Sequence, residues 1–104
     1  MNVLDSFRLD GKVALVSGGS GLYGKQIVLA LAEAGATVYT ASRSLETNEK
    51  YAERLRNDGY KVYAETLDMS YEESVIALKD RIISANGKID ILVNNAVLRT
   101  MENG

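Results

Sequence analysis

The sequence predicts an α/β fold, a doubly wound parallel sheet of about four strands with helices on both faces. Short runs rich in Val, Ile, Thr and Tyr alternate with longer segments whose apolar residues recur at helical spacing. A glycine follows each helical segment, and proline is absent. With 104 residues the chain has the length of one domain, and we expect residues 1–104 to form a single domain.

Strands and helices are expected to alternate from the first strand to the last. The expected strands are 12–17, 37–41, 60–66 and 89–93, and the expected helices are 21–34, 45–57 and 70–85. Apolar Val13–Val16 favours a buried first strand, and the run Ile27–Ala32 favours the first helix. Gly35 suits the left-handed conformation that ends many helices, and the β-branched and aromatic second strand follows it.

The second half of the chain repeats this pattern. Ser44 suits the N-cap of the second helix, and Gly59 suits its end. The third strand alternates polar and apolar residues. Ser70 and Glu73 have the spacing of a capping box for the third helix. The last strand, Ile89–Val93, is mostly apolar, as expected for a strand covered on both faces.

This order of elements predicts a Rossmann-like sheet. Right-handed crossovers between parallel strands give the strand order 3-2-1-4. Ligands of such sheets bind beyond the carboxyl ends of the strands, where the order reverses between strands 1 and 4. The glycine-rich segment 17–24 and the segment Asn94–Ala96 both fall at that place.

The glycine-rich segment has the composition of a phosphate-binding turn. Its residues are Ser17, Gly18, Gly19, Ser20, Gly21, Leu22, Tyr23 and Gly24. Gly18 permits a tight turn, Gly21 lets the backbone approach a pyrophosphate, and Gly24 allows close packing of helix and strand. Backbone N–H groups of the following helix would bind the phosphate, and Ser17 and Ser20 can add hydroxyl hydrogen bonds.

Two other interpretations stay open for this segment. It can be a turn that binds no ligand, or the start of a P-loop, since Gly19–Lys25 fits the first seven positions of that motif. The eighth residue of a P-loop is a Ser or Thr that holds Mg²⁺, and here it is Gln26. Gln26 therefore disfavours a nucleotide triphosphatase.

The end of the second strand indicates which dinucleotide is preferred. Sites for NAD place an Asp or Glu there, about 20 residues after the glycines, to bind the ribose 2′-hydroxyl. This chain has Ser42, Arg43 and Ser44 instead. An Arg–phosphate contact contributes about 1.5–3 kcal/mol, whereas a carboxylate would repel a 2′-phosphate. We expect NADP(H) to be preferred over NAD(H), unless Arg43 is only a surface charge.

Composition disfavours several other classes of function. The net charge of −2, with Lys and Arg scattered among acids, indicates no basic surface for binding nucleic acid or an anionic membrane. Cys and His are absent, so we expect no disulfide and no metal site. No apolar run approaches the roughly 18 residues of a membrane span, and the N-terminus has no signal-peptide pattern. We therefore expect a cytoplasmic protein.

The glycine turn resembles that of the short-chain dehydrogenase/reductase family, and the resemblance to the N-terminal half of that family extends over the whole chain. Segment 17–24 is similar to the family's Thr-Gly-x-x-Gly-x-x-Gly form, with Ser17 in place of Thr. The family's commoner form has a glycine at the position of Leu22. Ser42 and Arg43 are similar to the strand end of NADPH-preferring members.

Two later motifs carry the same resemblance. Leu67–Ser70 resembles the segment after strand 3 whose Asp contacts adenine, and Leu92–Val97 resembles the Asn-Asn-Ala-Gly motif after strand 4, with Val97 for glycine. The resemblance implies cofactor contacts at the adenine and along the ribose by Asp68, Met69, Asn95, Ala96 and Val97. Asp68 could instead help to cap the third helix, and the asparagines could form only a polar strand end.

The resemblance also implies an oxidoreductase that transfers hydride between a nicotinamide and a small carbonyl or alcohol substrate, with the full-length enzyme a homo-oligomer. The family's catalytic Ser and Tyr-x-x-x-Lys lie beyond strand 4, and none of the six tyrosines here has a Lys four residues later. We expect the cofactor-binding half of a longer enzyme, with no catalytic residue in this chain. The alternative is a non-catalytic dinucleotide-binding module with a regulatory or assembly role.

Overall fold

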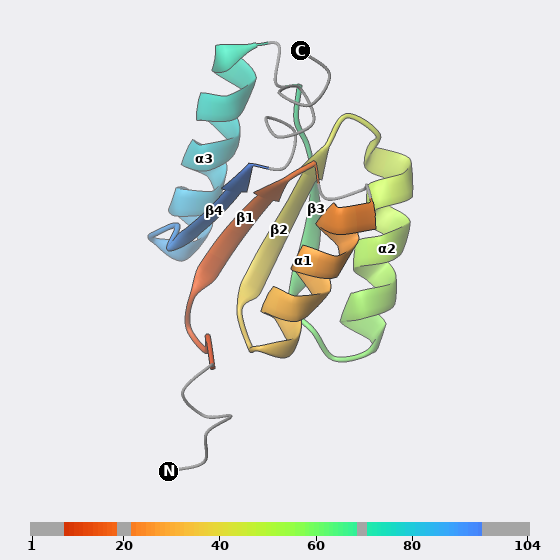
Figure 1. Ribbon diagram of the computed structural model, residues 1–104. Coiled ribbons are helices and arrows are strands. Elements are labelled where there is room, and N and C mark those ends of the chain that lie inside the picture. The colour runs from red at the N-terminus through yellow and green to blue at the C-terminus, as the bar shows by residue number, and fades with distance from the viewer. Residues whose placement is uncertain (1–7, 19–21, 69–70, 95–104) are drawn as a thin grey trace.

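The computed structural model describes residues 8–18, 22–68 and 71–94, in which strands and helices alternate as expected. The elements are β1 (Val13–Ser17), α1 (Leu22–Glu33), β2 (Thr37–Ser42), α2 (Leu45–Asn57), β3 (Val62–Thr66), α3 (Glu72–Asn86) and β4 (Ile91–Asn94). The strands form one parallel sheet in the order β3-β2-β1-β4 (Figure 1). The predicted fold class and strand order are confirmed.

Strand β1 is the centre of the sheet and is buried along its whole length. Ala14 and Val16 belong to the hydrophobic cluster on the face of α1 and α2, whereas Val13 and Leu15 belong to the cluster on the face of α3. Successive side chains of a strand point to opposite faces, so a strand covered on both sides needs apolar residues throughout. This requirement explains the unbroken apolar run that predicted the strand.

The helices form the two outer layers, with α1 and α2 on one face of the sheet and α3 on the other (Figure 1). Helix α1 packs on β1 and β2, and α2 packs on β2 and β3. Helix α3 contributes Leu78 and Ile82, both buried, to the opposite face. Each fully buried aliphatic side chain of this size contributes about 1.5–3 kcal/mol, so these contacts hold the layers together.

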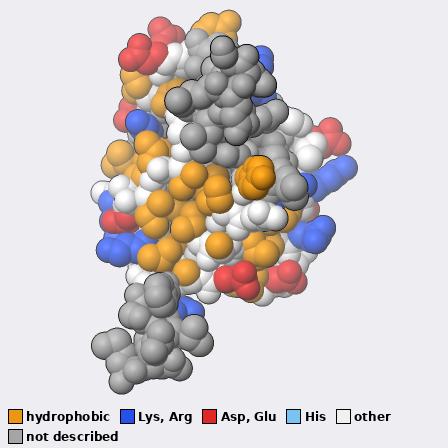
Figure 2. Space-filling model, viewed as in Figure 1, with side chains coloured by type: hydrophobic (Ala, Val, Ile, Leu, Met, Phe, Trp, Pro, Cys, Tyr) orange, Lys and Arg blue, Asp and Glu red, His pale blue; other side chains and the backbone are white. Residues whose placement is uncertain are grey.

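Strand β4 lies at an edge of the sheet and is less covered than its sequence predicts. Leu92, beside Leu15 in the sheet, is 55% exposed, and Ile91 and Val93 on the other face are only partly buried. Figure 2 shows hydrophobic side chains gathered over β4 and β1. The strand is apolar on both faces, and its side chains are covered less completely than those of β1.

The helix caps differ from expectation at two N-termini. Ser44 is the N-cap of α2, but its hydroxyl donates to Thr47 Oγ1 at 3.3 Å and makes no bond to the helix backbone. The N-cap of α3 is Tyr71, so the helix begins one residue later than the predicted capping box requires, and Ser70 lies outside the described residues. The glycines that follow the helices have the positive φ expected of them: Gly35, Gly59 and Gly87.

A buried polar pair fixes α2 to β2. Thr40 Oγ1 donates to Asn48 Oδ1 at 3.0 Å, and Asn48 Nδ2 donates to the Thr40 carbonyl at 2.5 Å. Both residues are fully buried, where a polar group is tolerated only if it is hydrogen-bonded. The pair therefore holds the start of α2 against the end of β2, just before Arg43 in the sequence.

We predict that Asn48→Ala lowers the free energy of unfolding, because it removes both buried bonds between Asn48 and Thr40 and leaves the Thr40 hydroxyl buried without its acceptor. The expected loss is about 1–3 kcal/mol, the cost of one buried polar group left unpaired, measured by urea unfolding. The double variant Thr40→Val/Asn48→Leu removes both polar partners and should recover much of the loss. An Asn48→Ala variant as stable as the original chain would contradict this account.

Candidate functional site

The candidate site lies beyond the carboxyl ends of the strands. The register of the sheet places Ser17 of β1 beside Ala41 of β2 and Asn94 of β4. Ser42 lies beside Thr66 of β3. All four strands therefore end at the same edge of the sheet, and α1 begins there (Figure 1). This is the edge at which the topology predicts a ligand.

Ser17 links β1 to β4 at this edge. Its buried hydroxyl lies 3.0 Å from Asn94 Oδ1 and 3.3 Å from the carbonyl of Val93, and it donates to these acceptors. A hydroxyl has a single proton, which these two acceptors share or alternate in receiving. Ser17 therefore positions Asn94, a role that the glycine motif did not indicate.

Gly18 makes the turn out of β1. Its φ of 74° lies in the left-handed region, where a side chain would be strained, and its N–H donates to the Ala41 carbonyl at 2.8 Å. The first glycine of the predicted motif thus has the conformation that a tight turn requires. Gly19, Ser20 and Gly21 lie outside the described residues.

The N-terminus of α1 carries no acidic residue in its first turn, whereas α2 has Glu46 there and α3 has Glu72 and Glu73. An acid at that position would offset the partial positive charge of the helix end. Among the described helices α1 is therefore the one whose positive end is not offset by an acid of its own first turn. Leu22 begins this helix, Tyr23 is exposed, and Gly24 is buried, as close packing requires.

The end of β2 presents one exposed cation. Ser42 is buried, and its hydroxyl donates to the Ser44 carbonyl at 3.1 Å. The Ser42 carbonyl accepts from the N–H of Leu67 at 3.0 Å, which ties this turn to the end of β3. Arg43 and Ser44 are exposed, and no described residue forms an ion pair with Arg43. The turn is thus held by the serines, and the guanidinium is available to a ligand.

The end of β3 adjoins a small, mostly apolar cavity. Asp68 is half-buried, and its N–H donates to Ser74 Oγ at 3.3 Å. The nearby cavity, of about 70 Å³, is lined by Leu15, Ser17, Leu67, Val75, Leu78, Lys79, Leu92 and Asn94. The remaining predicted contacts lie outside the described residues: Met69, Asn95, Ala96 and Val97.

Asp90 is a structural residue that the sequence analysis missed. Its carboxylate accepts from the Val13 N–H at 2.8 Å and pairs with Lys88 Nζ at 3.2 Å, and its own N–H donates to the Val13 carbonyl at 2.8 Å. The bond from Val13, supported by Lys88 and opposed by partial burial, holds the pKa of Asp90 below its usual value. Asp90 thereby joins the amino ends of β1 and β4, and β4 begins after it. Its signal in the sequence is an acid within the apolar run Ile89–Val93.

We predict that Asp90 makes stability depend on pH in the acid range. Because its pKa is lower in the folded chain, its contribution is complete above the unfolded value of about 3.9 and is lost as the pH falls through the folded value. Asp90→Asn should therefore be less stable than the original chain at neutral pH, and the gap should narrow on acidification. Urea midpoints measured between about pH 7 and pH 2 test this.

The exposed Asp80 offers a matched control, since Asp80→Asn removes a carboxylate that forms no ion pair with the described residues. That variant should follow the original chain across the pH range. A difference between Asp90→Asn and the original chain that stays constant with pH would show that the charge of Asp90 is not what matters.

Two further kinds of site are not found among the described residues. No cluster of three or more His, Cys, Asp or Glu side chains there could hold a metal ion. Over the same residues, no helix combines the length and apolar character needed to cross a membrane.

A glycine in the left-handed conformation, followed by a helix with no acid in its first turn at the switch point of a parallel sheet, is the arrangement of dinucleotide-binding α/β proteins. A family model described as short chain dehydrogenase matches residues 12–103. The chain belongs to this family of oxidoreductases, as the sequence motifs indicated.

The relatives are longer proteins of the same kind. A 7alpha-hydroxysteroid dehydrogenase of Escherichia coli (strain K12) is 37% identical over 92 residues, which are 88% of this chain and 36% of that protein. An uncharacterized oxidoreductase of Mycobacterium tuberculosis is 42% identical over 93 residues, 89% of this chain and 35% of that protein.

A solved structure agrees with the observed fold. The crystal structure of a gluconate 5-dehydrogenase from Burkholderia cenocepacia J2315, in complex with NADP and tartrate, has a TM-score of 0.81 at 37% identity and covers 90% of this chain and 37% of that one. The chain thus spans about a third of the length of the relatives it matches.

Proposed function

We propose that this chain is the cofactor-binding part of an NADP(H)-dependent oxidoreductase that moves a hydride between the nicotinamide and a small carbonyl or alcohol. One observation carries the proposal: the acid-free N-terminus of α1 follows the left-handed Gly18, and Arg43 stands exposed at the end of the adjacent strand. The first feature suits a pyrophosphate, and the second suits a 2′-phosphate. Membership of the family supports the reaction, and a relative solved with NADP supports the cofactor.

Different residues of the chain would contact different parts of the cofactor. The pyrophosphate would lie at the turn 18–24, and the 2′-phosphate at Arg43, in a turn closed by the bond from the Ser42 hydroxyl to the Ser44 carbonyl. The adenine would lie near Asp68, beside the apolar cavity at the carboxyl end of β1. Met69 and Asn95–Val97 would complete the adenine and ribose contacts.

The cofactor supplies the hydride, and the part played by this chain is to bind and orient it. Reduction of a carbonyl also needs a proton donor at the carbonyl oxygen. Tyr39, which has Arg43 four residues later, is not suited to that role, because its hydroxyl lies beside Asn86 at the C-terminal end of α3, away from the carboxyl edge of the sheet. We propose that the proton donor comes from a longer polypeptide, which would act as a homo-oligomer on a small-molecule substrate.

We predict that Arg43→Ala weakens NADPH binding about ten- to a hundredfold, because it removes a charge-assisted contact worth about 1.5–3 kcal/mol. NADH lacks the 2′-phosphate, so its affinity should stay within about twofold. Isothermal titration with both nucleotides measures the two effects. Equal losses for NADPH and NADH would show that Arg43 does not recognise the 2′-phosphate.

We also predict that the 104-residue chain binds NADPH without oxidising it. The cofactor site lies in this chain, but the proton donor does not. The measurement is NADPH absorbance over time, with the purified chain and a panel of aldehydes and ketones. Oxidation that increases in proportion to the protein concentration would contradict the prediction.

A second candidate function is a non-catalytic dinucleotide-binding module that assembles with another chain. The apolar edge strand β4, with Leu92 55% exposed, favours it, because an uncovered sheet edge can pair with another chain. The two candidates differ in one measurable property: only the first requires that a longer polypeptide containing this chain oxidise NADPH.

A further inference from the structure

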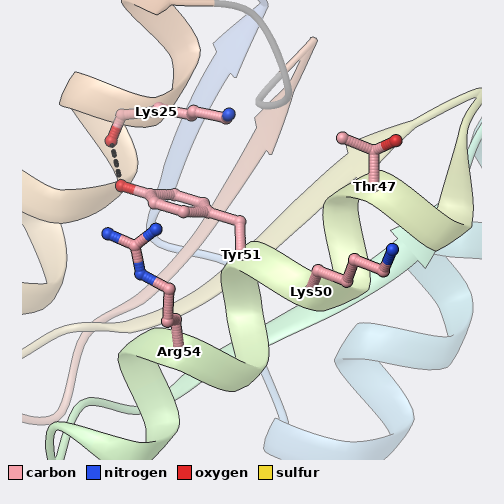
Figure 3. A pocket seen from close by; sticks show the side chains of 5 residues that line it. All are labelled: Lys25, Thr47, Lys50, Tyr51 and Arg54. Carbon is pink, nitrogen blue, oxygen red and sulfur yellow. Dashed lines mark hydrogen bonds between the residues drawn. The ribbon is translucent and has the colours of Figure 1, made fainter.

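A basic groove lies between α1 and α2, apart from the residues assigned to the cofactor. Its volume is about 290 Å³. It is lined by Lys25 of α1 and by four residues of α2, which are Thr47, Lys50, Tyr51 and Arg54 (Figure 3). Three of the five lining side chains are cations, and no carboxylate lines it. We call it the α1–α2 groove.

The spacing of residues on α2 creates this groove. Its four lining residues stand at positions i, i+3, i+4 and i+7 of the helix, so they share one face. A second face, formed by Asn48, Ala52 and Leu55, is buried against the sheet. No acidic residue of α2 lines the groove, although Glu46 stands one turn before Lys50.

Tyr51 holds the two helices in place around the groove. Its hydroxyl donates to the Lys25 carbonyl at 2.9 Å, and Lys25 Nζ lies 5.4 Å from the centre of its ring (Figure 3). Burial raises the pKa of Tyr51, although Arg54 opposes this effect, so the phenol stays a neutral donor. The Lys25 ammonium thus lies over the ring of Tyr51. Figure 3 shows the Arg54 guanidinium near the phenol oxygen.

The positive charge of the groove is poorly balanced. Lys50 pairs with Glu46 at 3.7 Å, but both side chains are largely exposed, and such a pair contributes little. Lys25 and Arg54 form no ion pair with any described residue. The chain as a whole carries a net charge of −2, so this concentration of cations is local. A local excess of one sign attracts an ion of the opposite sign.

We propose that the α1–α2 groove binds the phosphate group of a small molecule. Lys25, Lys50 and Arg54 supply charged donors to it. Thr47 adds a hydroxyl, whose oxygen already accepts from Ser44 and whose proton is left to donate. The groove is at the lower end of the size of small-ligand sites, which suits a phosphate group. Arg43 does not line it, so the site does not depend on the proposed cofactor preference.

The test is a titration of the chain with inorganic phosphate and with pyrophosphate, followed by amide NMR shifts and repeated with sodium chloride at equal ionic strength. Shifts should concentrate at Lys25, Thr47, Lys50 and Arg54. The variant Lys25→Gln/Arg54→Gln should weaken binding at least about tenfold, because each charged contact is strong. This double variant keeps the hydrogen bond from the Tyr51 hydroxyl, because that bond is accepted by the backbone carbonyl of residue 25.

Lys61→Gln is the matched control, because Lys61 is an exposed cation before β3, at the amino ends of the strands. This variant should bind phosphate as the original chain does. Equal affinity in the Lys25/Arg54 variant, shifts spread over all the lysines, or the same shifts with chloride would overturn the proposal.

Two sources of the phosphate group are distinguished by adding nucleotides. If NADPH shifts the groove amides and NADH does not, the groove receives the 2′-phosphate of the cofactor. If inorganic phosphate still shifts them in the NADPH-saturated chain, the groove takes a separate phosphorylated molecule. Both results support a phosphate site. A chain that binds phosphate there but binds no dinucleotide would refute the proposed function and leave this site standing.

Discussion

The pairing of β1 with a parallel strand on each side is the constraint on which the rest of the structure depends. It covers both edges of β1, and the helices on either side of the sheet cover both faces, which is why the strand consists of apolar residues up to Ser17. It also delivers Gly18 to the place where the strand order reverses, so the chain turns into α1 at the edge where ligands of such sheets bind. The sheet thus places the glycine turn at the ligand-binding edge, which is why we assign the turn a role in function.

Polar contacts join β1 to β4 at both ends of the two strands. At the amino end the Asp90 carboxylate binds the Val13 N–H, and at the carboxyl end the Ser17 hydroxyl binds Asn94. Together they hold the edge strand β4 in register with β1. The hydrogen bonds between Thr40 and Asn48 join β2 to α2, so the turn that carries Arg43 is held between two fixed elements. The candidate site is thus positioned by buried and partly buried hydrogen bonds in the strands and helices behind it.

Much of the fold follows from local patterns in the sequence, and the rest depends on contacts between distant residues. Apolar runs, helical spacing and terminal glycines predicted the elements, and the preference for right-handed crossovers predicted the strand order. Asp90 and Val13 are 77 positions apart, so no local pattern could reveal their bond. Ser44 and Ser70 had good capping patterns, but Ser44 bonds to Thr47 and α3 begins after Tyr71. The α1–α2 groove was missed because it needs the relative placement of two helices.

The central claim is that the carboxyl edge of the sheet is the dinucleotide site. Amide hydrogen exchange of the chain, measured with and without NADPH, tests it most directly. Exchange should become slower at Gly18, in the first turn of α1, at Arg43 and at Asn94, and should stay the same near Lys61 and Asp90 at the amino ends. Slowing at the amino ends, or no change at the carboxyl edge with saturating NADPH, would contradict the account.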